Sequence, residues 1–135
     1  MTTPTKHQIG LLSEEATEME IDGFRGELIT VDHTDYDSAR AVWNGGVDRH
    51  PRLIARCSGS ADVAAAVRFA REHDLEIAVR GGGHNVGGTA VCDDGIVIDL
   101  SAMRAVWVDP AGRTALVQAG ALWGDVDRET QAHGL

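Results

Sequence analysis

A run of glycines that begins after Arg80 constrains this chain more than any other feature. The run reads Arg80-Gly81-Gly82-Gly83-His84-Asn85-Val86-Gly87-Gly88, and it follows a short segment, 76–79, that is typical of a β-strand. Glycines adopt positive φ angles and let the backbone approach a ligand closely. Successive backbone N–H groups in such a turn form a nest that binds anions, and a diphosphate is a natural occupant. We call residues 80–88 the glycine loop and predict that it binds an anion.

Two common phosphate loops are excluded by the residues around these glycines. A Walker A loop needs a lysine and then Ser or Thr after its last glycine, whereas Gly88 is followed by Thr89 and Ala90. The dinucleotide fingerprint GxGxxG also fails, because Val86 stands where its last glycine would be. No helix is expected directly after the loop, so a helix dipole is not the main anion binder. Arg80 at its rim either contacts the anion or locks the loop.

His84 lies inside the glycine loop and has two interpretations. In the first, its ring only forms hydrogen bonds with the loop. In the second, its neutral imidazole acts as a nucleophile, because the pKa of histidine lies near neutrality. Beside an electrophilic cofactor, such a ring forms a covalent bond. The residues alone leave both interpretations open.

The remaining sequence predicts an α+β domain with a mixed sheet. Tyr36, Ala39 and Trp43 form one apolar face of a helix that begins at Thr34 or Asp35. The turn signal at 109–112 predicts a hairpin between the last two strands. The expected helices cover 13–21, 34–44, 60–73 and 122–133, and the expected strands cover 52–57, 76–79, 96–100, 105–108 and 114–118.

Charge and hydropathy exclude several classes of partner. The formal net charge of −9 argues against nucleic acid and against an anionic membrane surface. No apolar run approaches the ~20 residues that span a bilayer. The polar segment 1–10 lacks a signal-peptide core, so we expect a cytoplasmic protein. Lys6 is the only lysine, which indicates either a salt-adapted source or codon bias with an ordinary acidic surface.

The two cysteines, Cys57 and Cys92, are not spaced as CxxC, so no zinc site and no disulfide framework is expected. We interpret both as small buried hydrophobic residues, with a disulfide between them as the alternative. No other metal site is expected.

Beyond these local patterns, the chain resembles the FAD-binding subdomain of berberine bridge enzyme-like FAD-linked oxidases, which belong to the vanillyl-alcohol oxidase group. The resemblance covers roughly residues 24–135. The segments that carry it are 60–72, 80–85, 94–101 and 117–121, with Trp43 and Asn44 in the usual lead-in. It implies a mixed-sheet FAD-binding fold of the vanillyl-alcohol oxidase type, truncated here. We therefore expect residues 1–23 to be a leader and 24–135 to be the N-terminal part of the FAD-binding domain.

The resemblance also implies a cofactor and its ligands. In this family the glycine loop wraps the FAD diphosphate, and the loop histidine is commonly linked to the 8α-methyl carbon of the flavin, although some relatives hold FAD without a covalent bond. Carried over by position, the covalent candidate is His84. The predicted cofactor-binding residues are Arg80, Gly81, Gly82, Gly83, His84, Asn85, Gly87, Gly88 and Gly120.

The activity that the resemblance implies is oxidation of a small organic substrate by hydride transfer to FAD, with oxygen as acceptor. The catalytic residues and the substrate domain are expected beyond Leu135, so the chain is expected to be a fragment that binds FAD weakly and self-associates through uncovered surfaces. Two alternatives stay open. One is a noncatalytic flavin-binding module, and the other is a nucleotide-binding domain that does not use flavin.

Overall fold

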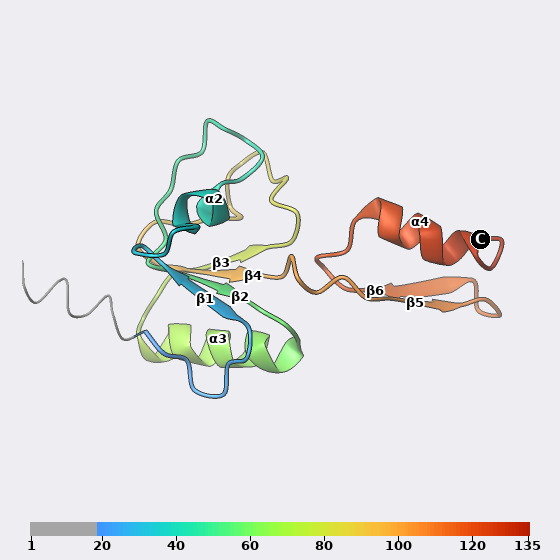
Figure 1. The fold of residues 1–135 in the computed structure, drawn as a ribbon, viewed down its shortest axis with the longest axis horizontal. Coiled ribbons are helices and arrows are strands. Elements are labelled where there is room, and N and C mark those ends of the chain that lie inside the picture. Colours follow the sequence, from blue (N-terminus) through green and yellow to red (C-terminus); the bar gives the residue numbers. More distant parts are fainter. Residues whose placement is uncertain (1–18) are drawn as a thin grey trace, which may run out of the picture.

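A four-stranded mixed sheet forms the centre of the protein (Figure 1). The computed structural model describes residues 19–135, in which the strand order is β1-β2-β4-β3. Strands β2 (Leu53–Arg56), β4 (Ile96–Asp99) and β3 (Ile77–Arg80) are parallel, whereas β1 (Glu27–Thr30) pairs antiparallel with β2. The central strand β4 is buried along its whole length. Its apolar sequence is typical of a parallel strand covered on both faces.

Helix α3 (Ser60–Glu72) covers one face of this sheet (Figure 1). The buried side chains on its inner face include Ala65, Ala66 and Ala70. These small residues let the helix approach Leu53 and Ile98 of the sheet, in the same apolar cluster. Ile21 is also buried in this cluster, although it precedes residue 24, where the domain is predicted to begin.

The opposite face of the sheet is covered by helix α2 (Tyr36–Arg40) and by the loops that follow β3. Ile54 and Val97 point to this face, while their neighbours in β2 and β4 point to α3. This alternation follows from the two-residue period of a strand. Both cysteines are free and buried, Cys57 on the α3 face and Cys92 on the α2 face, so their prediction as buried hydrophobic residues is confirmed.

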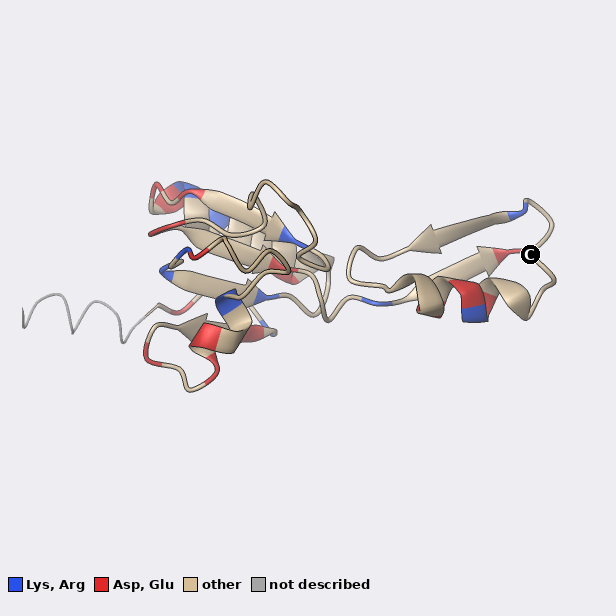
Figure 2. Cartoon of the chain, turned by 90° about the horizontal axis from the view of Figure 1, so that it is seen from above, with Lys and Arg blue, Asp and Glu red and all other residues tan. Residues whose placement is uncertain are grey.

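A smaller unit follows the sheet. Strands β5 (Val106–Asp109) and β6 (Thr114–Val117) form a separate antiparallel hairpin, and helix α4 (Trp123–Gln131) packs against it. Figures 1 and 2 show this hairpin unit projecting from the sheet, joined to it through the segment after β4. No residue of β5, β6 or α4 is buried. Among residues 19–135, no helix is both long and apolar enough to cross a membrane.

The structure confirms the α+β class with a mixed sheet and corrects three details. Strand β1 was not predicted, because its four residues form an edge strand with only Ile29 buried. The second helix ends at Arg40 rather than at 44, since Ala41 is extended with ψ 138° and turns the chain toward the glycine loop. Trp43 is therefore 68% exposed and is not part of a helix face. The predicted helix at 13–21 lies outside the described residues except for 19–21, which are not helical.

Candidate cofactor site

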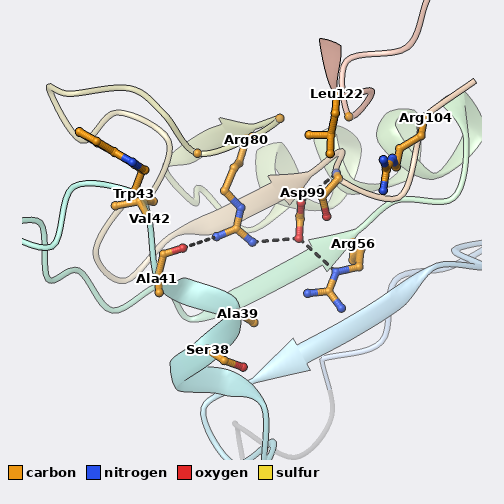
Figure 3. A pocket seen from close by; sticks show the side chains of 15 residues that line it. Ser38, Ala39, Ala41, Val42, Trp43, Arg56, Arg80, Asp99, Arg104 and Leu122 are labelled. Carbon is orange, nitrogen blue, oxygen red and sulfur yellow. Dashed lines mark hydrogen bonds and ion pairs between the residues drawn. The ribbon is translucent and has the colours of Figure 1, made fainter. Parts of the chain in front are cut away.

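A crevice of about 290 Å³ opens at the carboxyl ends of the three parallel strands (Figure 3). In open α/β sheets this edge is where ligands bind, because the strand ends and the loops that follow them diverge there. The volume is at the small end of the range for small-molecule pockets. The lining residues are Ser38, Ala39, Ala41, Val42, Trp43, Arg56, Arg80, Gly81, Gly82, Gly83, Asp99, Ser101, Arg104, Gly120 and Leu122.

Three charged side chains form a row across the floor of the crevice. Arg56, Asp99 and Arg80 are the last residues of β2, β4 and β3, and the strand register places them side by side. Arg80 Nη2 and Arg56 Nε both donate hydrogen bonds to Asp99 Oδ2, at 2.9 and 3.1 Å (Figure 3). The other carboxylate oxygen of Asp99 accepts the Ser101 backbone N–H at 3.0 Å. Asp99 is 1% exposed, so the row is held by a buried carboxylate.

Each arginine of this row has a second hydrogen-bond partner in addition to Asp99. Arg56 Nη1 donates to Glu27 Oε2 at 2.6 Å, and Arg80 Nη1 donates to the Ala41 carbonyl at 3.5 Å. Burial alone raises the pKa of Asp99, but the hydrogen bond and charge of Arg80 outweigh it, so that pKa lies below its ordinary value. Removing one partner of a buried pair costs roughly 3–5 kcal/mol. Asp99 therefore holds the Arg80 side chain at the start of the glycine loop.

The glycine loop presents unpaired donors beside this row. Within residues 19–135, the backbone N–H groups from Gly81 to Gly87 have no hydrogen-bond acceptor. Gly83 has φ +72° and its carbonyl accepts the Trp43 N–H at 3.0 Å, which fixes the peptide orientation. Successive N–H groups in such a conformation bind anions. A diphosphate fits this donor set, so the residues present suit the cofactor that the resemblance implies.

The segment after α2 holds the glycine loop from outside. In addition to the Trp43 N–H bond, Asn44 Nδ2 donates to the Val86 carbonyl at 3.0 Å. Val47 fills the space beside Gly88, whose φ is +76°. Because α2 ends at Arg40, residues 41–47 are free to leave the helix and contact the glycine loop.

Gly120 closes the crevice at the hairpin unit. Its backbone N–H donates to the Met103 carbonyl at 2.9 Å. A Cβ at this position would overlap the Leu100 carbonyl oxygen and lie 2.8 Å from the Met103 oxygen. Only glycine permits this approach, so Gly120 fixes the hairpin unit to the segment that follows β4.

His84 lies on the glycine loop but does not line the crevice. Its side chain is exposed, and its ring lies 6.2 Å from the Trp43 ring, centroid to centroid, at an interplanar angle of 40°. Its ring nitrogens form no hydrogen bond with any residue in 19–135.

Arg104 is the third arginine of the crevice, and its surroundings differ from those of the other two. Its Nε and Nη2 atoms donate to Asp125 Oδ2 at 3.0 and 2.6 Å. The same oxygen accepts the Leu122 N–H at 2.9 Å, which caps α4. The Arg104 side chain is 48% exposed and that of Asp125 is 29% exposed. Water screens an ion pair that is this accessible, so the pair is weak.

The crevice contains only part of the predicted set of cofactor residues. Arg80, Gly81, Gly82, Gly83 and Gly120 line it, whereas His84, Asn85, Gly87 and Gly88 do not. Asn85 instead caps a turn, because its Oδ1 accepts the Thr89 N–H at 3.2 Å.

Sequence reasoning missed several residues of the crevice, chiefly Arg56, Asp99, Ser101 and Arg104. A signal existed for two of these. Arg56 and Asp99 each end an apolar segment, and the carboxyl ends of parallel strands meet at one edge. The segment from 38 to 43 carried no comparable signal, since it joins the crevice through the unexpected turn at Ala41.

Comparison with known proteins identifies relatives of this site. Residues 51–135 match the FAD binding domain family. The chain is 42% identical over 111 residues to (R)-6-hydroxynicotine oxidase of Paenarthrobacter nicotinovorans, a match that covers 82% of this chain and 24% of that protein.

Solved structures give the same result. The crystal structure of 6-hydroxy-D-nicotine oxidase from Arthrobacter nicotinovorans matches 83% of this chain and 25% of its own, with a TM-score of 0.79 and 41% identity. The BBE-like 1 protein of Physcomitrella patens shares the fold, with a TM-score of 0.65 and 24% identity over 68% of this chain and 20% of its own. The chain thus spans about a quarter of the length of the relatives it matches.

Proposed function

Because this chain belongs to the FAD binding domain family of FAD-linked oxidoreductases, we propose that its crevice and glycine loop hold the diphosphate part of FAD. The observation that carries the proposal is that Gly81, Gly82 and Gly83, whose N–H groups have no acceptor among residues 19–135, line the crevice beside the row of charges at the strand ends. FAD, when bound, accepts hydride from an organic substrate. The residues of this chain bind and orient the cofactor.

The roles within this site follow from the contacts. Gly81, Gly82 and Gly83 supply backbone donors, Arg80 holds their position through Asp99, and Gly120 brings the hairpin unit close enough to form the far wall. Asn85, Gly87 and Gly88 shape the outer turn of the loop.

The proposal is tested by titrating the protein with FAD and following tryptophan fluorescence, since Trp43 lines the crevice. Gly83→Ala should weaken binding at least several-fold, because alanine strains the backbone at φ +72°. Gly45→Ala is the matched control, as a Cβ there meets nothing within 4 Å. Wild-type protein that binds no FAD would contradict the proposal.

We further propose that His84 forms a covalent bond with the flavin, in which a ring nitrogen replaces one hydrogen of the 8α-methyl group. The hydrogens displaced from the methyl group and the imidazole would reduce the flavin as two protons and two electrons, and oxygen would reoxidise it. Support comes from its exposed ring, which lacks a hydrogen-bond partner among residues 19–135, and from its place in the glycine loop. Protein loaded with FAD and precipitated in acid should give a yellow pellet, while His84→Ala should leave all flavin in solution. His73→Ala is the control, because that ring stacks on Phe69 away from the crevice. A colourless wild-type pellet would rule the bond out.

For a longer protein that contains these residues, we propose oxidation of a small organic substrate with oxygen as acceptor and a cytoplasmic location. For residues 19–135 alone, binding without turnover has support of its own. Asp99 is the only carboxylate that lines the crevice, and it is already paired with two arginines, so it is no general base.

A further inference from the structure

We propose that Arg104 is the side chain that binds the phosphate oxygens of FAD, and that it does so by leaving Asp125. This assignment rests on the proposed function and adds a ligand that the glycine loop does not contain. Three arginines line the crevice, and they differ in what each would lose by turning to a ligand.

Arg56 and Arg80 both stabilise the fold through ion pairs. Both donate to the same oxygen of Asp99, which is buried at the centre of the row. If either guanidinium moved to a phosphate, a buried carboxylate would lose a charged partner. Their positive charge therefore offsets Asp99 and Glu27 rather than a ligand.

Arg104, in contrast, is not paired with a buried carboxylate. Only one edge of its guanidinium is used, and both bonds go to a single oxygen of Asp125. Its Nη1 atom has no hydrogen-bond partner within residues 19–135. Guanidinium groups bind phosphates through two parallel N–H groups, and Arg104 has this geometry to offer on an exposed side chain.

Asp125 does not need Arg104 in order to stay satisfied. Its Oδ2 also accepts the Leu122 N–H, at the first turn of α4, where a negative charge is favourable. The pKa of Asp125 lies below its ordinary value, through that backbone hydrogen bond first and Arg104 second. Asp125 thus holds Arg104 beside the crevice. We expect a phosphate group of the ligand to displace Asp125 from Arg104.

Figure 3 shows the resulting arrangement. Arg104 stands beside Leu122 on the side of the crevice that is opposite Trp43, while Arg80 and Arg56 point at Asp99 between them. Gly81, Gly82 and Gly83 of the glycine loop and Arg104 therefore line the same crevice. An anion held between them is bound by backbone and side chain together.

The test compares three probes, FAD, ADP and riboflavin, by calorimetric titration of the full chain. Riboflavin lacks phosphates, so it separates phosphate binding from ring binding. Arg104→Gln should raise the Kd for FAD and ADP about tenfold, in line with the loss of one charge-assisted contact, and leave the riboflavin Kd unchanged. Arg104→Lys should recover part of the loss. Asp125→Asn should tighten ADP binding a few-fold, because Arg104 is released.

Arg128→Gln is the matched control, as that arginine lies on α4 with its guanidinium paired to its neighbour Glu129. Unfolding midpoints of all variants show that the changes are not losses of fold. If wild-type binds FAD and Arg104→Gln binds FAD and ADP within twofold of wild-type, the assignment of Arg104 is overturned while the proposed function stands. If wild-type binds neither FAD nor ADP, the proposed function fails, and the assignment fails with it.

Discussion

Arg80 Nη2 donates a 2.9 Å hydrogen bond to Asp99 Oδ2, and the two residues face each other at the carboxyl ends of β3 and β4. Arg80 is also the first residue of the glycine loop. The conformation of the loop therefore depends on a buried ion pair in the sheet. The last residue of a sheet strand is thus also the first residue of the glycine loop.

The first prediction concerns this pair. Asp99→Asn should destabilise the protein by roughly 3–5 kcal/mol, because Arg56 and Arg80 would both lose the buried negative charge with which they pair. Glu27→Gln is the control, since Glu27 is half-exposed and its loss should cost no more than about 1 kcal/mol. Urea unfolding followed by circular dichroism measures both. Equal midpoints for the two variants would contradict a structural role for Asp99.

The second prediction is a loss of stability in acid. Burial raises the pKa of Asp99 and of Asp62, but Arg80 in the first case and the Ser58 and Arg25 hydrogen bonds in the second outweigh it, so both pKa values are lowered. Between the folded and unfolded pKa values the unfolded chain binds more protons, so stability rises with pH there. These contributions are complete above the unfolded value of about 4 and are lost as pH falls through the folded values.

Urea midpoints measured from pH 7 to pH 2.5 check this prediction. Wild-type midpoints should fall steeply below pH 4, and Asp99→Asn should show a shallower fall, because one of the buried carboxylates with a lowered pKa is gone. A wild-type midpoint that stays constant down to pH 3 would show that neither carboxylate stabilises the fold.

The third prediction separates two glycines that lie four residues apart. Gly120→Ala should destabilise the hairpin unit strongly, because the new Cβ would overlap a backbone carbonyl that cannot move aside alone. Gly124→Ala should be neutral or stabilising by up to about 1 kcal/mol, since Gly124 is in α4 and a Cβ there meets nothing within 4 Å. Hydrogen exchange of the amides in β5 and β6 reports the difference, and a similar loss of protection in both variants would refute this view of Gly120.

The sequence predicted those elements correctly in which the local residue pattern matches the burial and pairing found in the fold. Segment 96–99 is apolar throughout and is the buried central strand, and the turn at 109–112 gives the hairpin. The failures are at Ile29 and Trp43. Ile29 is a lone buried residue in a short edge strand, and Trp43 leaves a helical pattern because its N–H bonds to Gly83, forty residues away. Arg104 was missed for the same reason, as its place in the crevice depends on how the hairpin unit docks.

The last prediction concerns the uncovered face of the hairpin. Trp107 and Leu116 are directly opposite in the strand register and are 54% and 70% exposed. Adjacent apolar side chains on an isolated two-stranded sheet promote association. The protein should therefore self-associate in a concentration-dependent way. Replacing both residues with serine should shift it toward monomer, whereas Val31→Ser, which removes an exposed apolar residue outside the hairpin, should not.

Sedimentation velocity over a hundredfold range of protein concentration distinguishes these outcomes. Serine at both positions removes apolar area without touching the crevice, because neither Trp107 nor Leu116 lines it. FAD binding by the double variant should therefore match that of wild-type at low concentration, which separates the hairpin surface from the cofactor site. Wild-type protein that stays monomeric at the highest concentration, or a double variant that associates as strongly as wild-type, would show that this face is not what brings copies together.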